Sequence, residues 1–117
     1  MTIREIMRLL DAEIVCCSDR IDNEVHLACG SDLMSDVLAF VKDQAVLITG
    51  LLNPQVVRTA EMMDMKCIVF VRGKRPDATI IELAEESGIV VLTTQHRMFS
   101  ACGILYSEGF SHGESRV

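Results

Sequence analysis

The sequence has no apolar run long enough to cross a membrane. Its apolar stretches, such as residues 67–71 and 89–92, are far shorter than the roughly 18 residues that a membrane-spanning helix needs. The first residues also lack the continuous apolar region of a secretory signal, because Arg4 and Glu5 interrupt it. We therefore expect a soluble protein that makes no use of a membrane and resides in the cytoplasm.

An excess of positive charge is also missing. Eleven Lys and Arg residues stand against 17 Asp and Glu residues, which gives a formal net charge of −6 at pH 7. A field of this sign repels phosphodiester backbones and anionic lipid surfaces. Nucleic acid and membrane surfaces are therefore not expected partners.

The cysteines are too few and too irregularly spaced for a disulfide framework or a zinc site. They form an odd set of five, and no two of them have the C-x-x-C spacing. We therefore expect reduced thiols and no metal site. Cysteines in apolar runs and on apolar helix faces usually behave as small buried hydrophobes, which is the interpretation here for Cys67 and Cys102.

Motifs for catalysis and for phosphate binding are absent from the sequence. The chain contains neither the P-loop pattern nor the glycine-rich dinucleotide fingerprint. No nucleophile with a neighbouring base and an orienting group can be assembled from local sequence. We therefore expect a protein that is not an enzyme and binds no cofactor. An enzyme whose catalytic groups come together only in the folded chain stays open as an alternative.

What the sequence does contain is an alternation of apolar stretches and segments with helical periodicity. Thr2 and Glu5 form a capping-box pattern. Asn53-Pro54 is a typical helix start, because the Asn side chain accepts from free backbone N–H groups and Pro lacks only an N–H group that would have no partner there. Ser31 is the predicted N-cap of a helix whose apolar residues 33, 34, 37, 38 and 41 should face the core. The predicted helices are 3–10, 32–41, 54–64, 77–87 and 97–107, and the predicted strands are 12–17, 25–29, 45–49, 67–71 and 89–93.

Strands that are apolar on both faces and separated by helices indicate a parallel sheet covered on two sides. The predicted fold class is therefore α/β, a three-layer α/β/α arrangement with a mostly parallel sheet of about four to five strands. With 117 residues the chain has room for one core, so we expect a single domain over residues 1–109. Residues 110–117 are expected to form a flexible C-terminal tail.

Polar and basic residues follow three of these strands where each strand ends. The carboxyl ends of parallel strands share one edge, and helix N-termini at that edge carry partial positive charge. We therefore expect an anion site there, although a solvated basic turn that only balances nearby glutamates stays open as the alternative. The predicted ligand-binding residues are Thr49, Gly50, Asn53, Arg72, Gly73, Lys74, Thr94 and His96.

The apolar content points to self-association. The mean hydropathy of +0.31 is high for so short a chain, and a small domain cannot bury everything apolar within itself. Leu51 and Leu52, which we expect to be exposed in the loop after the strand 45–49, are the predicted interface residues. A monomer with a core rich in Val, Ile and Met stays open, since exposed apolar surface is normal in monomers.

Segments 47–50, 68–76 and 80–94 together resemble the DRTGG domain family, and the resemblance extends over residues 3–109. It implies a noncatalytic α/β/α regulatory module that associates in pairs, similar to the N-terminal domain of the HPr kinase/phosphorylase. Segments 52–62 and 100–106 also resemble small stand-alone versions that occur beside hydrogenase or redox-complex components. The chain departs from the family after Gly50, where Leu51-Leu52 replaces the usual Asp-Arg, and at Val71-Arg72-Gly73, which replaces Thr-Gly-Gly.

Two hypotheses of function follow. The first is a homodimeric, noncatalytic regulatory or assembly module that contacts a protein partner. The second is a sensor that binds a small anionic ligand, such as a phosphate or a nucleotide, at the predicted anion site. The departures after Gly50 favour a protein contact in that loop.

Overall fold

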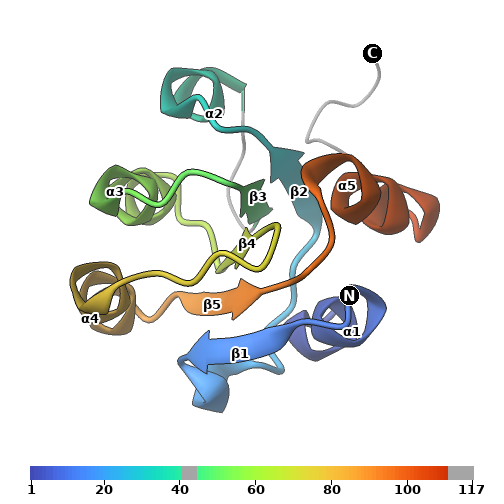
Figure 1. The fold of residues 1–117 in the computed structure, drawn as a ribbon, viewed down its shortest axis with the longest axis horizontal. Coiled ribbons are helices and arrows are strands. Elements are labelled where there is room, and N and C mark those ends of the chain that lie inside the picture. Colours follow the sequence, from blue (N-terminus) through green and yellow to red (C-terminus); the bar gives the residue numbers. More distant parts are fainter. Residues whose placement is uncertain (41–44, 111–117) are drawn as a thin grey trace.

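The computed structural model describes residues 1–40 and 45–110, which form one five-stranded sheet with helices on both faces (Figure 1). No helix in this part of the chain is long and apolar enough to span a membrane. One short 3-10 helix, η1 (Ser18–Arg20), follows the first strand. The helices are α1 (Ile3–Leu9), α2 (Met34–Phe40), α3 (Pro54–Met62), α4 (Ala78–Ser87) and α5 (Met98–Ser107), and the strands are β1 (Glu13–Cys16), β2 (Leu27–Gly30), β3 (Ala45–Thr49), β4 (Cys67–Phe70) and β5 (Val90–Thr93).

The sheet is mostly parallel, as the sequence predicts. Its strand order is β1-β5-β4-β3-β2, in which β2 to β5 run parallel and β1 pairs antiparallel with β5. Helices α2, α3 and α4 cover one face, and α1 and α5 cover the other (Figure 1). The three-layer α/β/α prediction is confirmed.

The central strands contribute to two hydrophobic clusters, one on each face of the sheet. Every residue of β3, β4 and β5 is buried. Because successive side chains of a strand point to opposite faces, Leu47 and Ile68 pack toward α3 and α4, while Val46 and Val69 pack toward α1 and α5. This is why these strands read as continuous apolar runs.

The predicted helix starts are confirmed where a side chain caps the helix. Thr2 and Glu5 form the reciprocal capping box of α1. Asn53 Oδ1 accepts a hydrogen bond from the backbone N–H of Gln55 at 2.8 Å, with Pro54 as the first residue of α3. At the other end of α4, Gly88 adopts φ 69° in the left-handed conformation that favours glycine.

The start of α2 differs from the prediction. Ser31 does not cap this helix, because its Oγ accepts from the N–H of Leu33 in a local turn and α2 begins only at Met34. The core-facing stripe is also narrower than predicted. Met34 and Val37 are buried, but Leu33 and Leu38 are 57% and 40% exposed. Residue 41, the last of the predicted stripe, lies outside the described residues.

At the C-terminus, packing extends one residue past the predicted domain boundary. Phe110 is only 7% exposed and belongs to the cluster that also contains Leu105 and Ile3. The rest of the predicted tail, residues 111–117, lies outside the described residues.

Candidate functional site

The loops after β3, β4 and β5 meet at the carboxyl edge of the sheet, as their parallel pairing requires. The register places Thr49 beside Phe70, and Phe70 beside Thr93, so these strands end at the same level. Two backbone hydrogen bonds join the β4 and β5 loops, from the N–H of Arg72 to the carbonyl of His96 and from the N–H of Gly73 to the carbonyl of Thr94, both at 2.8 Å. We call this surface the carboxyl rim and define it by Asp32, residues 49–53, residues 72–74 and residues 94–96.

The three basic side chains of the β4 loop have different environments. Lys74 is half-buried, and its Nζ donates to the carbonyl of Gly50 at 2.6 Å, which ties the β4 loop to the β3 loop. Arg75 forms an exposed ion pair with Glu13 at 2.9 Å. Among the described residues, the guanidinium of Arg72 has no hydrogen-bond or ion-pair partner. Arg72 is therefore the cation of this loop that remains available to a ligand.

Arg72 lies over Gly50. Its Nη2 is 2.9 Å from the position that a Cβ on Gly50 would occupy, so the absence of a side chain there makes room for the guanidinium. Arg72 itself adopts φ 59°, a left-handed backbone conformation that is uncommon for a residue with a side chain. The exposed guanidinium is thus directed back across the end of β3.

Asp32 is the rim residue that the sequence analysis missed. Its Oδ1 accepts from the backbone N–H of Gly50 at 2.7 Å and from the hydroxyl of Thr49 at 3.0 Å. Asp32 follows β2, whose parallel pairing with β3 brings its carboxyl end to the same edge. That topology is the signal that could locate Asp32 from the sequence, since the sequence predicts a strand at 25–29. A carboxylate therefore already occupies the backbone donor that an anion would otherwise use.

The β5 part of the rim borders a cavity of about 240 Å³ lined by Leu10, Asp11, Thr94, Gln95 and His96. Thr94 is buried, and its hydroxyl donates to the carbonyl of Leu10 at 2.6 Å, which makes it a structural link to α1. His96 is half-buried beside this cavity. Of these two predicted ligand-binding residues, His96 is the one with its side chain still free among the described residues.

The remaining predicted rim residues have mainly structural contacts. Asn53 caps α3, so its side-chain carbonyl is already engaged. Leu51 is half-buried and packs against the cluster beneath α2, α3 and α4, which corrects the expectation of two exposed leucines. Leu52 is 41% exposed. Leu51 follows Gly50, the buried residue after β3, so its side chain starts close to this cluster.

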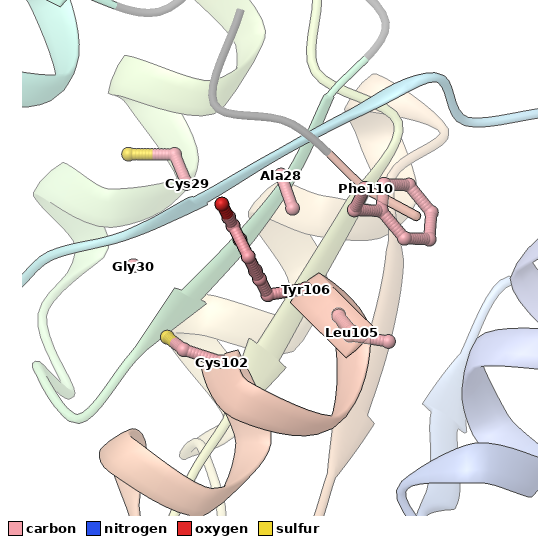
Figure 2. Close-up of a pocket in the computed structure, with 7 residues that line it drawn as sticks. All are labelled: Ala28, Cys29, Gly30, Cys102, Leu105, Tyr106 and Phe110. Carbon is pink, nitrogen blue, oxygen red and sulfur yellow. The ribbon is translucent and has the colours of Figure 1, made fainter. Parts of the chain in front are cut away.

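A second cavity, of about 160 Å³, lies between β2 and α5 (Figure 2). Its lining is mainly apolar and includes two cysteine residues, Cys29 and Cys102. Burial raises the pKa of both thiols above their ordinary value. The two thiols pack against opposite faces of the sheet, and Figure 2 shows the Cys29 sulfur directed away from Cys102. Within residues 1–40 and 45–110, no group of three His, Cys, Asp or Glu residues is placed to hold a metal ion.

Comparison with known proteins identifies one matching family. The model of the DRTGG domain matches residues 5–107. A solved structure with the same fold contains the CBS and DRTGG domains of the regulatory region of Clostridium perfringens pyrophosphatase, complexed with the activator diadenosine tetraphosphate. It superposes with a TM-score of 0.71 at 20% sequence identity, over 89% of this chain and 45% of that chain. Curated proteins yield no match.

Proposed function

This chain belongs to the DRTGG domain family, and from that premise we propose that it is a noncatalytic regulatory module that senses a small phosphorylated ligand, a nucleotide, at the carboxyl rim. The observation that carries the proposal is the exposed, unpartnered guanidinium of Arg72 over Gly50. A regulatory region with the same fold is complexed with a nucleotide activator, which supports this choice of ligand.

Asp32 favours a nucleotide over inorganic phosphate. Its Oδ1 is engaged by Gly50 and Thr49, whereas its Oδ2 has no partner among the described residues. Carboxylates that follow a strand of a parallel sheet commonly accept hydrogen bonds from ribose hydroxyls. Arg72 would pair with phosphate oxygens and Asp32 with the sugar, so a ligand that carries both groups uses the whole rim.

Thermal unfolding tests this proposal. We expect ADP or ATP to raise the melting temperature, because a ligand at one hundred times its Kd stabilises the native state by about 2.7 kcal/mol. Inorganic phosphate and pyrophosphate should bind more weakly because they lack the sugar. Arg72→Ala should weaken nucleotide binding roughly tenfold or more, the value of a charge-assisted hydrogen bond of about 1.5–3 kcal/mol. Isothermal titration calorimetry measures the change.

Arg58→Ala is the matched control, because Arg58 is an exposed arginine on α3 outside the rim. It should leave the nucleotide affinity unchanged. A melting temperature that no nucleotide moves at millimolar concentration would contradict the sensor proposal, as would equal losses in the two arginine variants.

Self-association is the second part of the proposed function. Large apolar side chains remain exposed on the monomer, among them Leu52, Phe99 at 89% and Tyr106 at 74%. A homodimer or a protein partner would cover such surface. Sedimentation velocity over a range of concentrations tests this part independently of any ligand. The association with hydrogenase or redox complexes that the resemblance implies stays a prediction.

A further inference from the structure

Helix α5 presents an exposed face without charge. Phe99, Ser100, Gly103, Tyr106 and Ser107 are all exposed and recur at spacings of three and four residues, which places them on one side of the helix. The opposite side, with Ala101 and Leu105, packs on the sheet. An apolar helix of this kind usually has a partner on both sides.

The absence of charge on this face matters because the protein carries a net charge of −6. The exposed face of α4 carries Glu82, Glu85 and Glu86, and two copies meeting there would bring like charges together. No residue of α5 is charged. Among these two helices, only α5 offers a surface on which a second acidic copy can pack without repulsion.

The exposed residues of α5 are arranged symmetrically about Gly103. From this symmetry we propose that two copies of the chain pair through α5, antiparallel, with the twofold axis at Gly103. The proposal rests on the self-association part of the proposed function and specifies its surface. Phe99 lies about 6 Å before Gly103 along the helix and Tyr106 about 4.5 Å after it, at a rise of about 1.5 Å per residue. Antiparallel pairing therefore brings Phe99 of each copy beside Tyr106 of the other.

Small residues allow the two helices to approach closely. At Gly103 a Cβ would meet no atom within 4 Å, so the space outside the helix is open. Ser100 and Ser107 lie on the same side of the helix and, in the paired arrangement, face each other across the axis. These residues line a shallow groove of about 510 Å³ that a second copy would fill.

Charge complementarity at the ends of α5 supports a second copy as the occupant. Arg97 precedes the helix and Glu108 follows it, and both are exposed without an ion-pair partner among the described residues. Antiparallel pairing about Gly103 places Arg97 of each copy at the level of Glu108 of the other, twice per dimer. A partner of unrelated sequence would have to carry an acidic residue opposite Arg97 and a basic residue opposite Glu108.

The available area indicates a dimer of modest affinity. Buried aromatic side chains contribute about 150–250 Å² each, so the four rings of a dimer supply roughly 600–1,000 Å². A stable interface needs about 1,200–2,000 Å² in total. The groove and the β2 side of α5, where Tyr106 borders the cavity in Figure 2, must supply the rest. We expect a dimer at the weak end of specific interfaces, with a Kd that has to be measured because buried area does not fix it.

Sedimentation equilibrium of the full chain tests the proposal. Gly103→Glu places two carboxylates at the twofold axis, and we expect it to weaken dimerisation at least tenfold. Because the site is open in the monomer, the variant should keep the circular dichroism spectrum and the melting behaviour of the folded monomer. Leu52→Glu is the matched control on the carboxyl rim and should leave the dimer intact.

A charge exchange tests the orientation of the two helices. Arg97→Glu and Glu108→Arg should each weaken dimerisation by roughly threefold, in keeping with exposed ion pairs, and the double exchange should restore the wild-type Kd to within about twofold. A merely structural role of either residue would give no such restoration.

The possible outcomes separate this surface from self-association in general. A dimer that Gly103→Glu leaves intact, or that Leu52→Glu abolishes, overturns pairing through α5 but retains self-association. A wild-type chain that is monomeric at hundreds of micromolar overturns both. Neither result bears on nucleotide binding at the carboxyl rim.

Discussion

At the scale of single residues, Asp32 accepts the hydrogen bonds that the end of β3 offers to the carboxyl rim. The end of β3 provides a backbone donor at Gly50 and a hydroxyl at Thr49, and both are satisfied by one carboxylate from a neighbouring loop. The guanidinium of Arg72 also approaches this glycine, at the position that a Cβ of Gly50 would occupy. Besides Lys74, whose Nζ is bonded to the carbonyl of Gly50, the rim thus carries the cation Arg72 and the anion Asp32, in keeping with the proposed ligand, which carries both phosphate and hydroxyl groups.

Removing the Asp32 carboxylate should destabilise the protein. Asp32→Ala leaves the N–H of Gly50 and the hydroxyl of Thr49 without their acceptor, and we expect a loss of about 1–2 kcal/mol in the free energy of unfolding. Urea denaturation measures it. Asp19→Ala, which changes an exposed aspartate of η1, should be neutral within the error of the method. Equal stability of the two variants would show that the hydrogen bonds of Asp32 contribute nothing.

At the scale of elements, side-chain caps mark the helix starts that were predicted well. The starts of α1 and α3 depend on bonds between residues two or three positions apart, which a sequence displays directly. Before α2, Asp32 accepts hydrogen bonds from the end of β3, and Ser31 accepts one in a local turn. The prediction of this helix start failed because a serine before an apolar stripe fits a turn as well as a cap.

The capping box of α1 should make stability depend on pH. Hydrogen bonds from the N–H and hydroxyl of Thr2 hold the pKa of Glu5 below its usual range. A carboxyl whose pKa is lower in the folded state contributes stability above its unfolded pKa of about 4.3, and this is lost as the pH falls through the folded value. Glu5→Gln should therefore flatten the acid side of the stability curve.

Thr2→Val is the matched variant, since it removes the hydroxyl of residue 2 and keeps the carboxyl of Glu5. It should flatten the same part of the stability curve. The double variant should change the free energy of unfolding by less than the sum of the two single changes. Urea denaturation between about pH 3 and pH 6 covers the window. Strict additivity of the two changes would contradict a coupled box.

At the scale of the whole molecule, the cysteine thiols differ in how deeply they are buried in the sheet. Burial raises the pKa of the Cys16 thiol to about 12 and also raises that of Cys67, which is fully buried in the central strand β4. Cys29, on the edge strand β2, is half-buried beside a cavity.

Alkylation rates should follow this difference in burial between the thiols. Cys67 should react only when the whole domain unfolds, because it lies between two layers of helices, whereas Cys29 should react by local opening. Iodoacetamide labelling of the native protein, followed by peptide mass spectrometry, measures both rates in one sample. Labelling of Cys67 as fast as Cys29 would show that the centre of the sheet opens locally.

The order of elements, the fully buried central strands and the edge at which their loops meet can all be predicted from the sequence. These features follow from apolar runs, caps and the geometry of parallel strands, all of which are local or periodic. Tertiary contacts fix which groups of the rim are hydrogen-bonded: the Lys74 ammonium to the carbonyl of Gly50, the Thr94 hydroxyl to the carbonyl of Leu10, and the backbone N–H of Gly50 to Asp32. The burial of Leu51 and the exposure of Phe99 and Tyr106 are also tertiary features, and on them we base the proposed interface at α5 in place of the predicted pair Leu51 and Leu52. Both depend on contacts between residues far apart in the chain, whose partners periodicity cannot specify.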